Sequence, residues 1–294
     1  MITMTREEMI RKAAQTRQTK PRPTVSREAL DRFPAQIETV CVQTRAAQTQ
    51  VYIGRSAQSS ADGPLMINLH GGGFIKEWTA NDELFCRQIL NRVGGCTVDI
   101  DYHLAPEYPF PTALHESFDV VQWAVTHAAE LGGNPRQLIL IGHSAGGNLA
   151  AGISMLAAKE GNFTPKLLIM DYPPVDLYTE PSKKEFRGGP PPEVAALYNL
   201  YYCDRGRQAD PLVSPLFALP EDLRGFPTTL IITAEQDTLC AEAEEFALNL
   251  ARAGTEVTLK RFPGTEHGFV IRQQPGYLDA LELMERKIQE TVQK

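Results

Sequence analysis

Residues 138–158 read LILIGHSAGGNLAAGISMLAA, and they contain the strongest indication of the fold in this sequence. It opens with four apolar residues, Leu138 to Ile141, which predict a buried strand. The sequence GHSAG at 142–146 follows, and the alanine-rich run after it, free of charge and proline, predicts a buried helix. Strand, G-x-S-x-G and helix form the nucleophile-elbow pattern, in which a tight glycine turn exposes Ser144 above the end of its strand.

Taken alone, this stretch allows three other interpretations. Its uncharged length could span a bilayer, but His143, Asn148 and the glycines, with no basic flank after them, disfavour a membrane helix. A phosphate-binding loop would need a lysine that is not in place. A structural turn with an idle serine carries equal weight, because the motif is short, until partners for Ser144 are found.

Composition excludes several classes of function. The net charge of −7 and the pI near 5.5 argue against nucleic acid or an anionic membrane as a partner. An apolar content of 43% with 22% charged residues is ordinary for a globular protein with a sizeable core. The first 20 residues contain no apolar segment typical of a secretory signal. The five cysteines form no C-x-x-C motif and predict reduced thiols in a cytoplasmic protein.

The order of hydrophobic patterns predicts an α/β fold. Two short polar helices, at 5–18 and 26–33, hold too little apolar area for a domain, so residues 1–36 are expected to lie on the rest of the chain as part of a cap. Alternation from residue 37 predicts an antiparallel pair of strands at a sheet edge. Strands and helices then alternate, which predicts a mostly parallel sheet covered on both faces, with ligands at the carboxyl ends of its strands. The expected strands of this part are 65–69, 96–100, 138–141, 166–170, 228–233 and 257–262.

One interval, about 175–226, breaks this alternation. It is rich in proline and contains a candidate helix at 193–203 with Leu197, Tyr198 and Tyr202 on it. A long insertion at the active end of a sheet is typical of a lid or a pocket wall. A surface excursion with a small core of its own is the alternative.

A serine nucleophile needs a base and an orienting carboxylate, and the elbow fold requires the chain order serine, acid, histidine. His267 is the only histidine after Ser144, and it lies in a glycine-flanked loop just past the strand 257–262. The strand 228–233 precedes both Glu235 and Asp237. We favour Asp237, because a shorter side chain holds the imidazole more rigidly, and Glu235 remains the alternative.

The remaining parts of the site follow from two glycine-rich turns. Residues 70–73, HGGG, follow a strand and can offer free backbone N–H groups to an oxyanion, as can Ala145 after the expected nucleophile. His143 cannot be the base, since adjacent side chains of an extended segment point to opposite sides, so we interpret it as structural. No H-E-x-x-H motif is present, and we expect neither a metal nor a cofactor.

Together these segments resemble the hormone-sensitive-lipase-like branch of the α/β-hydrolases, which includes many bacterial esterases. The segments that match, in the order of the family, are HGGGF at 70–74, DYHLAPE at 101–107, GHSAGG at 142–147, DPLVSP at 210–215, Asp237, and HGF at 267–269. The resemblance implies an eight-stranded, mostly parallel sheet flanked by helices, with a hydrolase domain at 37–294. It also implies a helical cap built from 1–36 and the insertion at about 175–226.

The resemblance implies a serine carboxylesterase with the triad Ser144, Asp237 and His267. The oxyanion donors implied are Gly72, Gly73 and Ala145. The family also suggests a homodimer joined near the strand 257–262.

Three positions depart from the family pattern. His143 stands where an acidic residue is usual, and His103 stands where arginine is usual. Both changes remove or invert a charge near the elbow, which calls the family's ion pairs there into question. Thr238 replaces a common proline after the expected acid. None of the three changes touches the reacting groups.

We therefore expect hydrolysis of small, short-chain acyl esters through an acyl-serine. Short chains are favoured because the expected pocket walls, Phe74, Trp78, Tyr198 and Tyr202, are bulky and no long apolar lid helix is present. An amidase or formamidase on the same triad is the nearest alternative. A non-catalytic small-molecule-binding protein with the hydrolase fold is the alternative from another class, and the presence of His267 argues against it.

Overall fold

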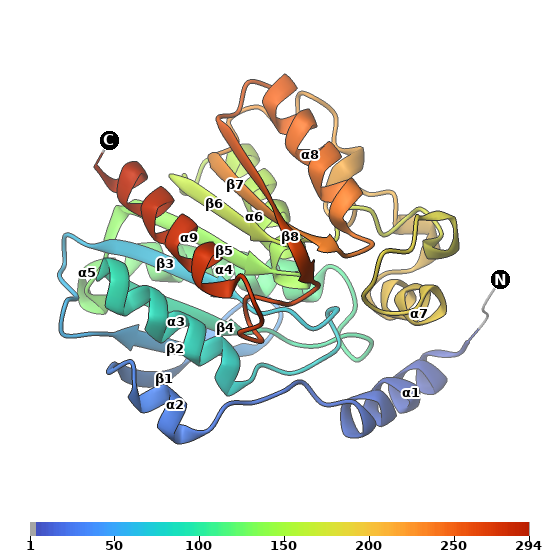
Figure 1. Cartoon of the computed structure of the whole chain (residues 1–294), viewed down its shortest axis with the longest axis horizontal. Coiled ribbons are helices and arrows are strands. Elements are labelled where there is room, and N and C mark those ends of the chain that lie inside the picture. The colour runs from blue at the N-terminus through green and yellow to red at the C-terminus, as the bar shows by residue number, and fades with distance from the viewer. Residues whose placement is uncertain (1–3, 294) are drawn as a thin grey trace.

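The computed structural model of the protein describes residues 4–293; residues 1–3 of the expected cap segment and residue 294 of the expected hydrolase domain lie outside them. A single eight-stranded sheet runs through these residues in the order β1-β2-β4-β3-β5-β6-β7-β8 (Figure 1). Its strands are β1 Gln36–Gln43, β2 Gln48–Arg55, β3 Pro64–Leu69, β4 Cys96–Asp101, β5 Asn134–His143, β6 Leu167–Asp171, β7 Thr228–Gln236 and β8 Val257–Glu266.

Strand direction follows the connections between the strands. β1 and β2 form an antiparallel hairpin at one edge, and β2 pairs antiparallel with β4. Every other pair is parallel, because a helix separates most of these strands in the chain. The predicted eight-stranded, mostly parallel sheet is confirmed.

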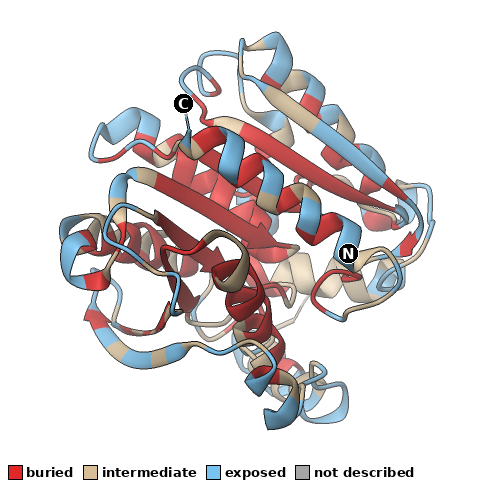
Figure 2. Cartoon of the chain, turned by 60° about the vertical axis from the view of Figure 1, so that its left-hand side comes forward, coloured by how far each residue is buried: buried red, intermediate tan, exposed pale blue. Residues whose placement is uncertain are grey.

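Helices cover both faces of the sheet. They are α1 Arg6–Thr19, α2 Arg27–Asp31, α3 Ala80–Val93, α4 Thr112–Thr126, α5 Ala128–Leu131, α6 Ala145–Glu160, α7 Pro192–Tyr202, α8 Cys240–Arg252 and α9 Tyr277–Val292. Along β5, Leu138 and Leu140 point into a core shared with α4, α6 and α8, while Ile139 and Ile141 point into a second core shared with α3 and α9. This alternation is the period of two expected of a strand buried on both sides, and Figure 2 shows the central strands buried along most of their length.

Arginines tie the N-terminal segment to the sheet domain. Thr5 and Glu8 form a capping box at the start of α1. Near the end of that helix, Arg17 holds Glu107 with two N–H groups, each at 2.8 Å, and also donates to the carbonyl oxygen of Ile75. The segment therefore lies over the loops that follow β3 and β4, on the side of the molecule that also carries α7 (Figure 1).

Two further findings concern membrane-spanning helices and the cysteines. No helix within residues 4–293 has both the length and the apolar character that crossing a membrane requires. All five cysteines lie within the described part of the chain, and each is a free thiol.

Candidate active site

Ser144 stands at a sharp turn between β5 and α6, as the elbow pattern predicts. Its φ of 52° and ψ of −120° lie in a region that residues with a side chain rarely adopt. Glycine is required on either side of Ser144, because any side chain there would clash with the backbone. A Cβ on Gly142 would lie 2.2 Å from the carbonyl oxygen of Gly146, and one on Gly146 would lie 2.0 Å from the carbonyl oxygen of Leu69.

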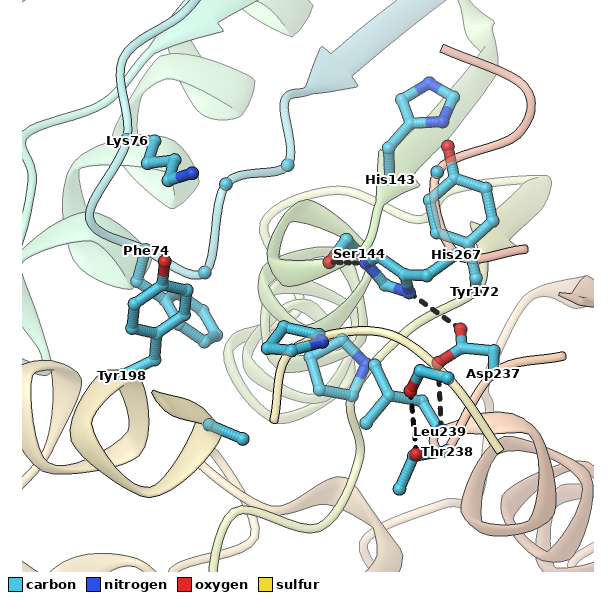
Figure 3. Close-up of a pocket in the computed structure, with 18 of the residues that line it drawn as sticks. Phe74, Lys76, His143, Ser144, Tyr172, Tyr198, Asp237, Thr238, Leu239 and His267 are labelled. Carbon is cyan, nitrogen blue, oxygen red and sulfur yellow. Dashed lines mark hydrogen bonds and ion pairs between the residues drawn. The ribbon is translucent and has the colours of Figure 1, made fainter. Parts of the chain in front are cut away.

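A continuous line of hydrogen bonds joins Ser144 to His267 and Asp237 (Figure 3). Ser144 Oγ lies 2.9 Å from His267 Nε2, and His267 Nδ1 lies 2.7 Å from Asp237 Oδ2. The second carboxylate oxygen of Asp237 accepts the backbone N–H of Leu239 at 3.1 Å. Asp237 is 1% exposed, so the carboxylate is held away from solvent in a fixed position. The structure thus brings the three residues expected to react into contact.

Glu235, the alternative acid, lies elsewhere. It is exposed, and its carboxylate accepts the backbone N–H of Gly264 at 2.9 Å. Because β7 ends at Gln236, Asp237 is the first residue beyond the strand and turns toward His267. The geometry favours Asp237 as the partner of the imidazole.

A glycine turn after β3 lies against the elbow. A Cβ on Gly71 would lie 3.0 Å from the carbonyl oxygen of His143, so the two turns approach at backbone distance. Gly72 and Gly73 have φ values of 126° and 63°. Among the described residues no acceptor receives the N–H of Gly72, Gly73 or Ala145, the last because it opens α6. These three groups are free to bind an oxyanion beside Ser144.

A cavity of about 270 Å³ is bordered by Gly72, Gly73, Ser144, Asp237 and His267. Phe74 and Tyr198 line it, as expected of pocket walls, and Figure 3 shows both rings across the pocket from His267. The expectation for Trp78 and Tyr202 is wrong, because neither borders the cavity. The Trp78 indole N–H donates to the Asp99 carboxylate at 2.5 Å, which turns the ring away. Tyr202 is 1% exposed and stacks behind Phe74, with ring centroids 3.6 Å apart.

Two residues at the site were not singled out from the sequence as part of it. Tyr172 follows β6 directly, has a φ of 40°, and sets its ring edge-on to His267 at 5.0 Å. Its position just past a strand end was the available signal. Thr238 accepts the N–H of Arg187 at 3.1 Å and donates to the carbonyl oxygen of Gly188 at 2.8 Å. It therefore ties the insertion to the loop of Asp237 through a hydroxyl that the usual proline lacks.

The two unusual histidines each find a carboxylate. His143 Nδ1 lies 2.8 Å from Asp171 Oδ2, and both side chains are buried. Burial raises the pKa of the Asp171 carboxyl. His103 Nδ1 lies 2.7 Å from Glu116 Oε2, while its backbone N–H donates to the other oxygen at 2.6 Å. The His143 ring turns away from Ser144 in Figure 3, as expected of a structural residue.

Within residues 4–293, no group of three or more histidine, cysteine, aspartate or glutamate side chains is arranged to hold a metal ion. At the cavity, the described residues offer a hydrogen-bonded line of hydroxyl, imidazole and carboxylate.

Comparison with known proteins gives the same family. The family model of the α/β-hydrolase fold matches residues 66–271. An arylesterase of Saccharolobus solfataricus is 32% identical over 211 residues, which cover 70% of this chain and 68% of that protein. Bovine hormone-sensitive lipase is 39% identical over 119 residues, which cover 40% of this chain and 16% of that protein. The first curated relatives are matched over only 57% to 68% of their own lengths.

Solved structures of esterases superpose on this protein along nearly its whole chain. A thermostable carboxylesterase from a metagenomic library superposes with a TM-score of 0.82 at 28% identity, covering 99% of each chain. An esterase of Pyrobaculum calidifontis gives 0.80 at 26% identity, covering 97% of this chain and 92% of that one. The resemblance drawn from the motifs is thereby confirmed, and the chain belongs to the α/β-hydrolase family, in its hormone-sensitive-lipase-like branch.

Proposed function

We propose that this protein is a serine carboxylesterase that hydrolyses short-chain acyl esters through an acyl-serine intermediate. The proposal is based on the hydrogen bonds that join Ser144 Oγ to His267 Nε2, at 2.9 Å, and His267 Nδ1 to the Asp237 carboxylate, at 2.7 Å. The relatives named arylesterase and carboxylic ester hydrolase support ester cleavage as the reaction.

In the proposed reaction, Ser144 Oγ attacks the ester carbonyl while His267 Nε2 takes its proton. Asp237 fixes the imidazole tautomer and stabilises the imidazolium that forms. The carbonyl oxygen becomes an oxyanion, which the N–H groups of Gly72, Gly73 and Ala145 bind. His267 then gives the proton to the departing alcohol, and water releases the acid by the same steps in the second half-reaction.

Pocket size supports short acyl groups. The cavity of about 270 Å³ lies just below the range of small-molecule sites, roughly 300–1,000 Å³. Phe74 is 3% exposed and immobilised by Tyr202, so one wall of the cavity is rigid. Residues of both expected cap segments, Arg22 from the N-terminal one and Tyr198 from the insertion, border the cavity and support their assignment to a cap.

Hydrolysis of p-nitrophenyl esters with acyl chains of two to eight carbons tests the proposal. We expect turnover of the acetate and butyrate, and none in the Ser144→Ala variant. A matched amide separates esterase from amidase. An organophosphate should add one phosphoryl group to Ser144, measured by mass spectrometry. Absence of turnover with every chain length would contradict the proposal.

We also propose that the protein is a cytoplasmic homodimer joined along β8. β8 is the last strand of the sheet, and Leu259 on it is 41% exposed, which supports pairing at this edge. The five free thiols agree with a reducing compartment. Light scattering on the purified protein should give twice the mass of one chain; a single-chain mass at micromolar concentration would refute the dimer. Recovery of the protein outside the cytoplasmic fraction of its cell would refute the location.

A further inference from the structure

Positive charge exceeds negative charge at the cavity that contains Ser144. The charged side chains that border it, among those described, are Arg22, Lys76, Lys184, Arg272, Asp176 and Asp237. The chain as a whole carries a net charge of −7, so this excess of cations is local. A site lined by one sign of charge concentrates ligands of the opposite sign.

Two of the four cations are already neutralised. Arg22 donates to both carboxylate oxygens of Asp82, at 2.7 and 2.8 Å. Lys184 pairs with Glu242 at 2.5 Å and lies 3.9 Å from the Asp176 carboxylate. These two cations serve the folded structure and leave little charge for a ligand.

The other two cations, Lys76 and Arg272, have no ionic partner among residues 4–293. Within the described part of the chain neither side chain takes part in an ion pair or a hydrogen bond. Lys76 lies in the turn of the expected oxyanion donors, since a Cβ on Gly72 would sit 3.0 Å from Lys76 Cβ. The Arg272 side chain covers Gly268, the neighbour of His267, with Nε 3.1 Å from a Cβ placed there. One cation thus stands beside the oxyanion turn and the other beside the expected base.

The surroundings of Lys76 make its unpaired charge unfavourable. Lys76 is half-buried, and burial together with the nearby Arg272 and Arg22 lowers the pKa of its ammonium. Figure 3 shows its ammonium end turned toward the middle of the pocket, away from Phe74. An anion in the cavity would supply the missing partner of both groups.

We propose that the Ser144 site takes esters that carry a carboxylate, bound by Lys76 and Arg272. The proposal rests on the esterase function proposed above and names its substrate class. A guanidinium and an ammonium both form charge-assisted hydrogen bonds with carboxylates. A carboxylate is also compact enough for a small cavity. It can belong to the acyl half, as in the half-ester of a dicarboxylic acid, or to the alcohol half.

Matched substrates test this inference. For the acyl half, the mono-p-nitrophenyl ester of glutaric acid is compared with p-nitrophenyl butyrate. For the alcohol half, 4-carboxyphenyl butyrate is compared with phenyl butyrate. The double variant Lys76→Gln/Arg272→Gln should lower kcat/KM for the anionic member of one pair by about 10- to 100-fold, and for the neutral member by less than about threefold.

The control is Lys159→Gln, which makes the same change of charge at an exposed lysine at the end of α6. It should leave kcat/KM unchanged for the anionic and the neutral ester of each pair. Added salt should lower kcat/KM for the anionic ester and leave the neutral ester unaffected, because salt screens the charges of the exposed Arg272 and the half-buried Lys76. Equal losses on neutral and anionic esters in the double variant, or no loss on either anionic ester, would overturn the inference.

Binding separates this inference from the proposed function. Calorimetry with monomethyl glutarate on the Ser144→Ala protein detects the cation pair without turnover. Binding that is lost when Lys76 and Arg272 are also replaced supports the pair even if no ester is hydrolysed. Absent binding, or binding unchanged by their replacement, refutes the pair even if neutral esters are hydrolysed well.

Discussion

Substituting Gly73 by alanine should report directly on the contact between the insertion and the oxyanion turn. A Cβ on Gly73 would lie 2.5 Å from Cδ2 and 3.1 Å from Cε2 of Tyr198, a residue of α7. Ordinary contact begins near 3.4 Å, so 3.4 − 2.5, or 0.9 Å, must be opened by moving the turn, the ring or both. A misplacement of about 1 Å in a site can cost roughly 10²-fold in rate. We therefore expect Gly73→Ala to lower kcat/KM for p-nitrophenyl butyrate by about 10²-fold.

The backbone makes a separate contribution, which is measured as a change in stability. Gly73 has a φ of 63°, where a residue with a Cβ costs about 1–2 kcal/mol. Gly161, at the end of α6, has a φ of 71°, and a Cβ added there would have no heavy atom within 4 Å. Gly161→Ala is therefore the matched control. It should lower the melting temperature by about 2–8 °C, as Gly73→Ala should, and leave kcat/KM unchanged.

Removal of the Tyr198 ring tests whether this ring is what the added Cβ at position 73 clashes with. Tyr198→Ala in the Gly73→Ala background should recover at least about tenfold in kcat/KM, because the clash is with that ring. The assay measures steady-state hydrolysis of p-nitrophenyl butyrate by the wild type, Gly73→Ala, Tyr198→Ala and the double variant. The melting temperature of each protein is measured alongside. Wild-type activity in Gly73→Ala, or no recovery in the double variant, would refute the contact between α7 and the turn.

Three further predictions address the acid, a buried carboxyl and the link to the insertion. Asp237→Asn should lower kcat by about 10⁴-fold by losing the imidazole tautomer, whereas Glu235→Gln should leave kcat within about threefold; comparable losses would reopen the assignment of the acid. Burial raises the pKa of Asp99 to about 8 from 3.8, so the folded state binds this proton more tightly. Its contribution to stability is fully present below about pH 4 and is lost as pH rises to about 8. Asp99→Asn should flatten the fall in melting temperature between pH 5 and 9, and an unchanged slope would disprove this role. Thr238→Val removes the hydrogen bonds to Arg187 and Gly188 and should raise KM by about three- to tenfold with little change in kcat; an unchanged KM would show that the link does not shape the pocket.

Much of the fold could be predicted because its signals are local. The apolar runs of β3, β5 and β6 and the glycine turns after β3 and β5 depend on neighbours in sequence, and the structure has each of them where the pattern indicated. Ser144, Asp237 and His267 could be proposed together because chain order in an elbow fold limits the choices. The walls of the pocket could not be assigned this way. Trp78 and Tyr202 are bulky and near the site in sequence, yet an acceptor on β4 and the ring of Phe74 draw them elsewhere.

The sheet, the elbow and the candidates for nucleophile, base and acid could all be predicted from the sequence, since periodicity, glycine positions and motif order are properties of short segments. Tertiary structure alone decided which side chains face the cavity and which charges there are left unpaired. Arg22 and Lys76 are both cations in the sequence, but packing places Asp82 against Arg22, whereas no carboxylate of the described residues forms an ion pair with Lys76. Burial and pairing depend on residues far apart in the chain, and a linear pattern does not record them.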